Sequence, residues 1–144
     1  MRLRFLFRIT RVRIMNEEKD KSKKLILVVE DDSVLRPLLV ELLNEMEYNV
    51  LVAEDGQQAL SLLQDLNDKQ NNIDLLLTDI GLPGMNGNDL AKTAREMWPN
   101  LSILFITGYS HGVGKLPIDD NIKLITKPFS LGVLTKRVEE LVAR

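Results

Sequence analysis

Side chains that could bind a cation and an anion together follow four short apolar runs of this sequence. Glu30 ends KLILVVE and Asp31 comes next, Asp79 follows IDLLLT, Thr107 ends LSILFIT, and Lys127 follows IKLIT. Concentrated carboxylates repel one another unless a positive charge joins them. Lys127 supplies one such charge, and a divalent cation would supply two.

The turn after Asp79 suits a Mg²⁺ site. Its sequence, IGLPGMNG, is rich in glycine, so a backbone carbonyl can come close to the carboxylate, and Gly81 is the natural candidate. Mg²⁺ prefers oxygen ligands in near-octahedral geometry, which two carboxylates plus that carbonyl would suit. The remaining space would take an anion with tetrahedral oxygens, and an aspartate can itself be the nucleophile that forms an aspartyl phosphate.

These runs belong to a regular alternation of predicted strands and helices. The predicted strands are 24–30, 49–53, 73–78, 101–107 and 122–126. Apolar residues recur at helical spacing in 34–46, 56–66, 90–98 and 131–142, and Ser33 and Ser130 are the expected caps of the first and last of these helices. Segment 108–121 contains three glycines and a proline, so a fourth helix there is expected to be short or irregular.

The alternation predicts an α/β fold with a single doubly wound parallel sheet and helices on both faces. In such sheets, ligands bind beyond the carboxyl ends of the strands, where the candidate residues lie. No G-x-G-x-x-G motif follows the first predicted strand, which argues against a dinucleotide-binding fold.

The composition excludes several function classes. Hydrophobic residues make up 44% and charged residues 28% of the chain, which suits one globular domain. There are no cysteines, so a disulfide framework, a thiolate metal site and a cysteine nucleophile are excluded. All acidic residues follow residue 15, and this acidic body argues against direct nucleic-acid binding.

The first 23 residues differ from the rest. Residues 1–15 interleave five arginines with apolar residues, and a nearly all-charged stretch follows. We expect 1–23 to be a disordered leader, with Met15 as an alternative start, and 24–144 to be the folded domain. Contact of residues 1–15 with a membrane surface is the less favoured alternative. A signal peptide would need a longer unbroken apolar stretch.

Four stretches together resemble the receiver domain of two-component response regulators, the CheY-like family. They are LILVVEDD, LLLTDIGLPGMNG, ILFITGY and LITKPF, and they follow the family order and spacing across about 120 residues. The resemblance implies a flavodoxin-like five-stranded sheet with strand order 2-1-3-4-5. It also implies a cis peptide bond between Lys127 and Pro128.

The resemblance implies a role for each candidate residue. Asp79 would be the phosphoacceptor, Glu30 and Asp31 the acidic pair that holds Mg²⁺ together with Asp79, the Gly81 carbonyl a backbone ligand, and Thr107 and Lys127 the partners of the phosphoryl oxygens. The expected function is therefore a cytoplasmic phosphoacceptor signalling module. It would receive its phosphoryl group from a sensor histidine kinase or a histidine phosphotransfer protein, and would switch its affinity for a downstream protein.

The sequence departs from the family at one switch position and leaves other functions open. Many receivers carry an aromatic residue three positions before the lysine, where this chain has Leu124. FITGY and LITKPF are similar to receivers attached to hybrid histidine kinases.

We expect no enzyme activity beyond phosphorylation and dephosphorylation of the chain itself. A receiver that acts only as a scaffold is one alternative. A metal-dependent aspartyl-phosphate phosphohydrolase is another, but its DxD motif does not match EDD.

Overall fold

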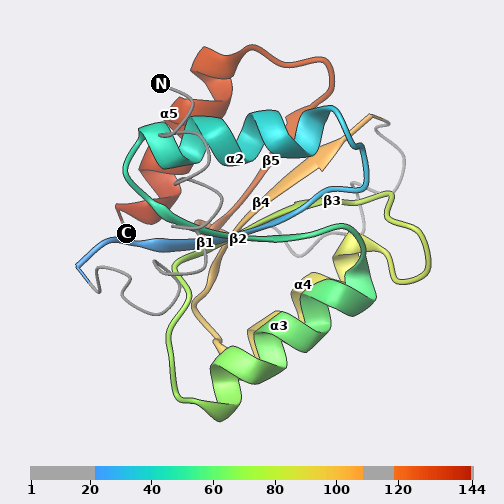
Figure 1. The fold of residues 1–144 in the computed structure, drawn as a ribbon, viewed down its shortest axis with the longest axis vertical. Helices are drawn as coiled ribbons and strands as arrows, with labels where there is room; N and C mark the ends of the chain where they lie inside the picture. Colours follow the sequence, from blue (N-terminus) through green and yellow to red (C-terminus); the bar gives the residue numbers. More distant parts are fainter. Residues whose placement is uncertain (1–21, 109–118, 144) are drawn as a thin grey trace, which may run out of the picture.

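A computed structural model of the chain describes residues 22–108 and 119–143 (Figure 1). The predicted leader lies outside these described residues up to residue 21, and so does most of segment 108–121, where a short helix is predicted. Among the helices of the described residues, none is long and apolar enough to cross a membrane.

The described residues form one parallel sheet of five strands in the order β2-β1-β3-β4-β5, which confirms the expected fold. The strands are β1 (Leu25–Val29), β2 (Asn49–Ala53), β3 (Leu75–Asp79), β4 (Ser102–Thr107) and β5 (Ile122–Thr126). β3 ends one residue later than predicted, because Asp79 pairs with Ile106 of β4. A carboxylate is rare in a buried strand, so the pattern alone placed the boundary before it.

The helices of the described residues are α2 (Leu35–Glu45), α3 (Gly56–Asp68), α4 (Gly87–Met97) and α5 (Leu131–Val142). The side chains of Asp55, Asn86 and Ser130 each accept a backbone N–H in the first turn of α3, α4 and α5. Such caps satisfy amide groups that have no partner within the helix, so each of these three helices begins at a defined residue.

The expectation that Ser33 caps the first helix is wrong, because Val34 is the N-cap residue of α2 and has no side-chain cap, and Asp32 accepts the amides that lead into the helix. Oδ1 of Asp32 accepts the N–H groups of Val34 and Leu35 at 2.8 and 3.0 Å. These two hydrogen bonds hold the pKa of Asp32 below its ordinary value. The carboxylate has two oxygens and a full negative charge, so it binds the N-terminal amides of α2 better than the serine hydroxyl would.

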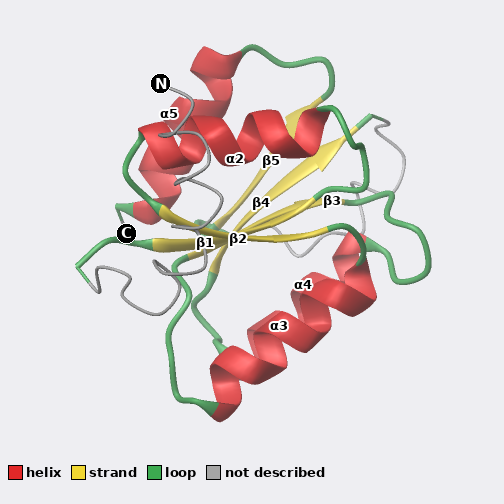
Figure 2. Ribbon diagram, in the orientation of Figure 1, coloured by secondary structure: helices red, strands yellow, loops and turns green. Residues whose placement is uncertain are grey.

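Two apolar cores lie on opposite faces of the sheet (Figure 2). Helices α3 and α4 cover one face, and α2 and α5 cover the other. Side chains alternate between the faces along β4, where Ile103 and Phe105 join the α3–α4 core and Leu104 and Ile106 join the α2–α5 core. The buried strands are therefore apolar on both sides, as a parallel sheet with two covered faces requires.

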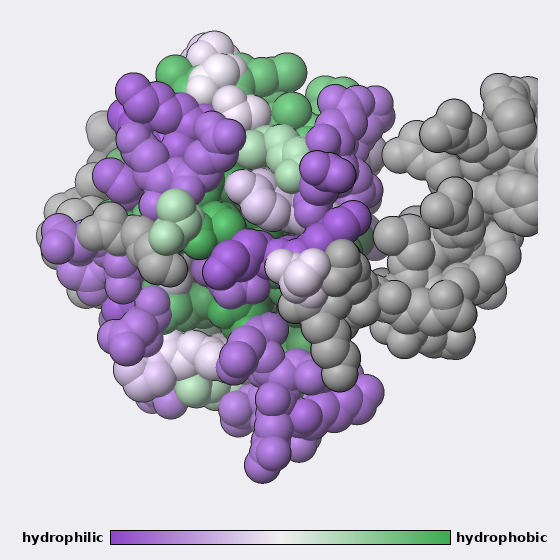
Figure 3. All heavy atoms as spheres, turned by 90° about the vertical axis from the view of Figure 1, so that its left-hand side faces the viewer, coloured by the Kyte–Doolittle hydropathy of each residue, from purple (hydrophilic) through white to green (hydrophobic). Residues whose placement is uncertain are grey.

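The parallel strands begin at one edge of the sheet and end at the other. Figure 3 views the edge where they begin, which is on the left in Figure 1, and hydrophilic side chains cover much of its described surface with hydrophobic ones visible between them. We call this the amino edge. The candidate residues of the sequence lie at the opposite, carboxyl edge.

Candidate functional site

Three polar side chains are buried at the carboxyl edge of the sheet. Glu30 follows β1, Asp79 is the last residue of β3, and Thr107 is the last residue of β4. They are 1%, 7% and 5% exposed. Burial of ionisable groups is unfavourable unless partners compensate for the lost water, so their contacts define what the site can do.

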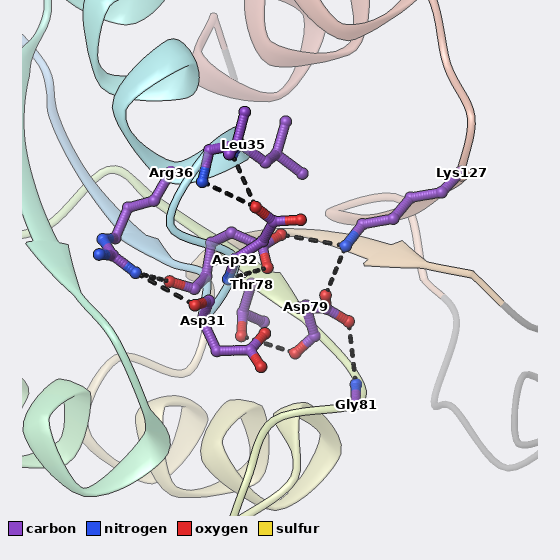
Figure 4. Close-up of polar contacts among 10 residues, drawn as sticks. Asp31, Asp32, Leu35, Arg36, Thr78, Asp79, Gly81 and Lys127 are labelled. Carbon is purple, nitrogen blue, oxygen red and sulfur yellow. Dashed lines mark hydrogen bonds and ion pairs between the residues drawn. The ribbon is translucent and has the colours of Figure 1, made fainter.

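Asp79 is held by contacts to both carboxylate oxygens (Figure 4). The Lys127 ammonium donates a 2.7 Å hydrogen bond to Oδ2, and the Gly81 amide donates a 2.9 Å hydrogen bond to Oδ1. The backbone carbonyl of Asp79 accepts a hydrogen bond from the Thr78 hydroxyl at 2.9 Å. The strand thus fixes the backbone of Asp79, while its carboxylate faces Lys127 and the Gly81 amide.

Glu30 shares the lysine but keeps one oxygen incompletely satisfied. Its Oε2 accepts the Asp32 N–H at 3.1 Å, and its Oε1 lies 3.2 Å from Lys127 Nζ. That Oε1 is buried, and its contact with the lysine is an ion pair, with no hydrogen bond to Oε1 from the described residues. Burial raises the pKa of Glu30 above the ordinary 4.5, and the charge of Asp79 adds to the increase against the opposing effects of Asp32 and Lys127.

Lys127 is the positive centre of this group. Burial alone would lower its pKa, but the hydrogen bond and charge of Asp79, together with Glu30, outweigh burial and raise the pKa above 10.5. Lys127 is therefore a cation at neutral pH. It follows β5, and its N–H donates a 2.7 Å hydrogen bond to the Thr107 carbonyl, which joins the ends of β4 and β5.

The carboxylates fit a hard divalent cation. Oxygen atoms of Glu30, Asp31 and Asp79 all lie within 4.8 Å of one another, and Asp31 is exposed while the other two are buried. The Lys127 ammonium contacts two of these three carboxylates, those of Glu30 and Asp79, and no group of the described residues donates a hydrogen bond to the buried Glu30 Oε1. Oxygen-rich groups with uncompensated negative charge are the ligands that Mg²⁺ takes, so the residues present fit this ion.

The turn after β3 brings α4 close to Asp79. A Cβ atom added at Gly87 would collide with the backbone carbonyl oxygen of Asp79, whereas one added at Gly81 would have Asp79 Oδ1, at 3.9 Å, as its nearest neighbour. The N–H of Gly87 donates a 2.9 Å hydrogen bond to the Ile80 carbonyl. Glycine at position 87 therefore allows the helix to pack directly against the end of the strand.

The structure brings the sequence-predicted residues together at this edge. Glu30, Asp31, Asp79 and Lys127 form one cluster, and Thr107 lies on the neighbouring strand, where it pairs with Thr126 of β5. Gly81 lies beside the carboxylate through its N–H, and the ligand role of its carbonyl stays a prediction.

Two further features bear on the predictions. The Lys127–Pro128 bond is cis, as the resemblance implies. Leu124, at the usual aromatic position, is half-buried against the α3–α4 core.

Sequence reasoning missed Arg36, which contacts the backbone of the acidic pair. The sequence held no signal for these contacts, because the acceptors are backbone carbonyls.

Comparison with known proteins identifies the family. The model of the response regulator receiver domain matches residues 26–139. The chain is 38% identical over 122 residues to the response regulator receiver protein CpdR of Brucella abortus, and the match covers 83% of this chain and 97% of CpdR. It is 30% identical over 121 residues to the sensor kinase CckA of the same organism, where it covers 83% of this chain and 12% of CckA.

Solved structures agree. The receiver domain of the hybrid histidine kinase CckA has a TM-score of 0.67 at 33% identity, over 81% of this chain and 98% of that one. The response regulator TrrA of Thermotoga maritima, solved with Mg²⁺ and BeF, has a TM-score of 0.67 at 31% identity, over 82% of this chain and 98% of that one. The chain therefore belongs to the response regulator receiver domain family, the phosphoacceptor modules of two-component signalling.

Proposed function

We propose that Asp79 is the residue that accepts the phosphoryl group, and that Mg²⁺ is the cofactor. The observation that carries this proposal is the geometry of one carboxylate. Asp79 contacts the Lys127 ammonium at 2.7 Å and has an oxygen within 4.8 Å of oxygens of both Glu30 and Asp31. An acceptor at this place has a cation on one side and a metal-binding acidic pair on the other.

The reaction moves one phosphoryl group between two proteins. An oxygen of Asp79 forms a bond to phosphorus as the bond from phosphorus to a histidine nitrogen of the donor breaks, and the released imidazole takes up a proton. The Lys127 ammonium and the Thr107 hydroxyl stabilise charge on the phosphoryl oxygens. When bound, Mg²⁺ neutralises the charge that the carboxylates and the phosphoryl group bring together. Glu30, Asp31, Asp79 and the Gly81 carbonyl would hold it.

The donor in this proposal is a sensor histidine kinase or a histidine phosphotransfer protein. The similarity to CckA, a sensor kinase, and to CpdR, a receiver protein, supports that class of partner. Phosphorylation would change the affinity of the chain for a downstream protein in the cytoplasm, with no reaction catalysed beyond turnover of its own phosphoryl group. With Leu124 at the aromatic position, this switch would be muted or would use other parts of the fold.

The test is the intact mass of the chain after incubation with Mg²⁺ and acetyl phosphate. The wild-type chain should gain one phosphoryl group, and Asp79→Asn or a chelator should abolish the gain. Asp74→Asn is the matched control, because Asp74 directly precedes the same strand at its opposite end. It should take up phosphate as the wild-type chain does.

Uptake at the wild-type level by Asp79→Asn would refute the assignment of the acceptor. A wild-type chain that gains no phosphoryl group from acetyl phosphate or from a phosphorylated histidine phosphotransfer protein would instead favour the scaffold function.

A further inference from the structure

The guanidinium of Arg36, on α2, holds the backbone of the acidic pair (Figure 4). Its Nη1 donates to the Glu30 carbonyl at 3.0 Å and to the Asp31 carbonyl at 3.3 Å. Its Nη2 lies 3.8 Å from Glu54 Oε1, just beyond the end of β2. One side chain therefore connects the loop after β1 with the end of the neighbouring strand.

The contacts of Arg36 determine how the acidic loop is presented. The Glu30 carbonyl belongs to the peptide plane that joins Glu30 to Asp31, and the Asp31 carbonyl belongs to the next plane, which joins Asp31 to Asp32. Because one donor holds both planes, it fixes the backbone on both sides of Asp31 and on the Asp31 side of Glu30, and so the directions in which the two carboxylates leave the backbone. The Arg36 N–H also donates to the Asp32 carbonyl at 3.0 Å, which attaches the loop to the first turn of α2.

A lysine at this position would not reproduce the arrangement. The guanidinium is a planar fork with five N–H donors, so it can face two carbonyls and a carboxylate at once. An ammonium is a compact point charge on a flexible stem, and it loses more conformational freedom for each contact. The side chain of Arg36 is only 19% exposed, and its hydrogen bond to the Glu30 carbonyl is partly buried, which protects that hydrogen bond from competition by water.

Arg95 provides an internal comparison at the amino edge. Its Nε donates to the Leu101 carbonyl at 2.8 Å, and its Nη1 and Nη2 donate to the Asp119 carboxylate at 3.1 and 3.3 Å. Its side chain is 22% exposed. Both arginines thus join a helix to a backbone carbonyl and to an acidic side chain, but the backbone that Arg36 holds is that of the acidic pair.

We propose that Arg36 is a positioning residue for cation binding: it fixes the loop of Glu30 and Asp31 in the arrangement that binds Mg²⁺. This inference rests on the proposed function, because it assumes that the acidic pair binds the ion. Arg36 is itself a cation and cannot be a ligand, so it acts through the backbone of the pair. Residues that orient metal ligands contribute roughly 10- to 100-fold to metal affinity.

The test is Mg²⁺ affinity, measured by calorimetric titration of the full chain with MgCl₂. Arg36→Ala should weaken binding by about 10- to 100-fold, Arg36→Lys by less, and Arg95→Ala by less than about 2-fold. Uptake from acetyl phosphate should show the same defect at low Mg²⁺, and saturating Mg²⁺ should restore the rate for Arg36→Ala. If Arg36→Ala only lowered the stability of the fold, saturating Mg²⁺ would not restore the rate of phosphoryl uptake.

Three outcomes would overturn the inference. Arg36→Ala could bind Mg²⁺ as the wild-type chain does, or Arg36→Ala and Arg95→Ala could lose affinity equally. If Arg36→Ala does not fold, Arg36→Lys is the test in its place, and wild-type Mg²⁺ affinity in that variant would also overturn the inference. Absence of Mg²⁺ binding by the wild-type chain would refute the proposed cofactor as well, so the titration of the unmodified chain separates the two failures.

Discussion

The two edges of the sheet both carry charged side chains, but the charges are balanced differently. At the amino edge Asp74 and Asp119 each have partners of their own. Asp74 accepts the Leu25 N–H at 2.8 Å, and Asp119 makes two hydrogen bonds with Arg95. Each of these contacts joins the start of a strand to a neighbouring element.

At the carboxyl edge, acidic groups share a partner instead. Glu30 and Asp79 both contact Lys127, and Asp31 adds a third carboxylate to the same cluster. Such a cluster is less stable without a ligand than with one, because the carboxylates repel each other. The two pairs at the amino edge neutralise their own charges, whereas the carboxyl edge gathers three carboxylates near one ammonium and keeps negative charge that a cation would neutralise.

The largest effect is expected at Gly87, where α4 packs directly against the backbone of Asp79. Gly87→Ala places a Cβ against the Asp79 carbonyl, so strand and helix must separate. We expect the free energy of unfolding to fall by about 1–3 kcal/mol, and phosphoryl uptake to slow as Asp79 moves. Denaturant titration and intact mass measure the two effects.

Gly81→Ala is the matched control for this glycine. Gly81 has space for a Cβ atom, so this substitution should change the free energy of unfolding by less than about 1 kcal/mol. Equal destabilisation by the two substitutions would show that close approach to Asp79 is not the reason for glycine at position 87.

A smaller effect, of opposite sign, is expected from Glu30→Gln. The pKa of Glu30 is raised, so the folded chain disfavours its ionised form, and a neutral isostere should increase the free energy of unfolding by roughly 1 kcal/mol at neutral pH without Mg²⁺. Mg²⁺ affinity should fall at the same time. In the wild-type chain this part of the stability is present below pH 4.5 and is lost as pH rises through the raised pKa.

Denaturant titrations with a chelator, at several pH values, measure the stability of Glu30→Gln and the wild-type chain. Asp74→Asn serves as the amino-edge control, because it weakens a local hydrogen bond and should lower stability without changing Mg²⁺ affinity. If Glu30→Gln is less stable than the wild-type chain at neutral pH, the prediction is wrong. The buried carboxylate of Glu30 would then stabilise the fold even without a bound cation.

The sequence was sufficient for the fold and for the set of side chains at the carboxyl edge. Apolar runs with β-branched residues predicted each strand to within two residues, because strands covered on both faces need that composition. Parallel strands bring their ends to one edge, so residues far apart in the sequence, such as Asp79 and Lys127, could be placed together.

Other features depend on three-dimensional detail that the sequence pattern does not contain. Asp32 rather than Ser33 accepts the amides that lead into α2, because the choice depends on the path of the loop after β1. The role of Arg36 was missed because arginines on a helix usually face water, and its hydrogen bonds go to backbone carbonyls that any residue would offer. The close approach of Gly87 to Asp79 likewise depends on the geometry of the turn.

The smallest effect is expected at the amino edge, where Tyr48 precedes β2 and packs against the α2–α5 core. Burial raises the pKa of its phenol above 10.0, and the negative charge of Glu139 adds to this increase. Above pH 10 the unfolded chain therefore ionises first, so the stability that the neutral phenol contributes is present below pH 10 and is lost as pH rises through the folded pKa. Tyr48→Phe should remove this part of the alkaline loss.

Denaturant midpoints at pH 9 and pH 11 measure the difference between Tyr48→Phe and the wild-type chain. Both chains should lose stability in this range, because the raised pKa of Lys127 means that its ion pairs with Asp79 and Glu30 also disappear as pH rises above 10.5. Only the excess loss of the wild-type chain belongs to Tyr48. An identical loss in the two chains would place the whole alkaline response elsewhere in the chain, with Lys127 at the carboxyl edge as the first candidate. The amino edge would then contribute stability that does not depend on pH, which would sharpen the contrast between the two edges.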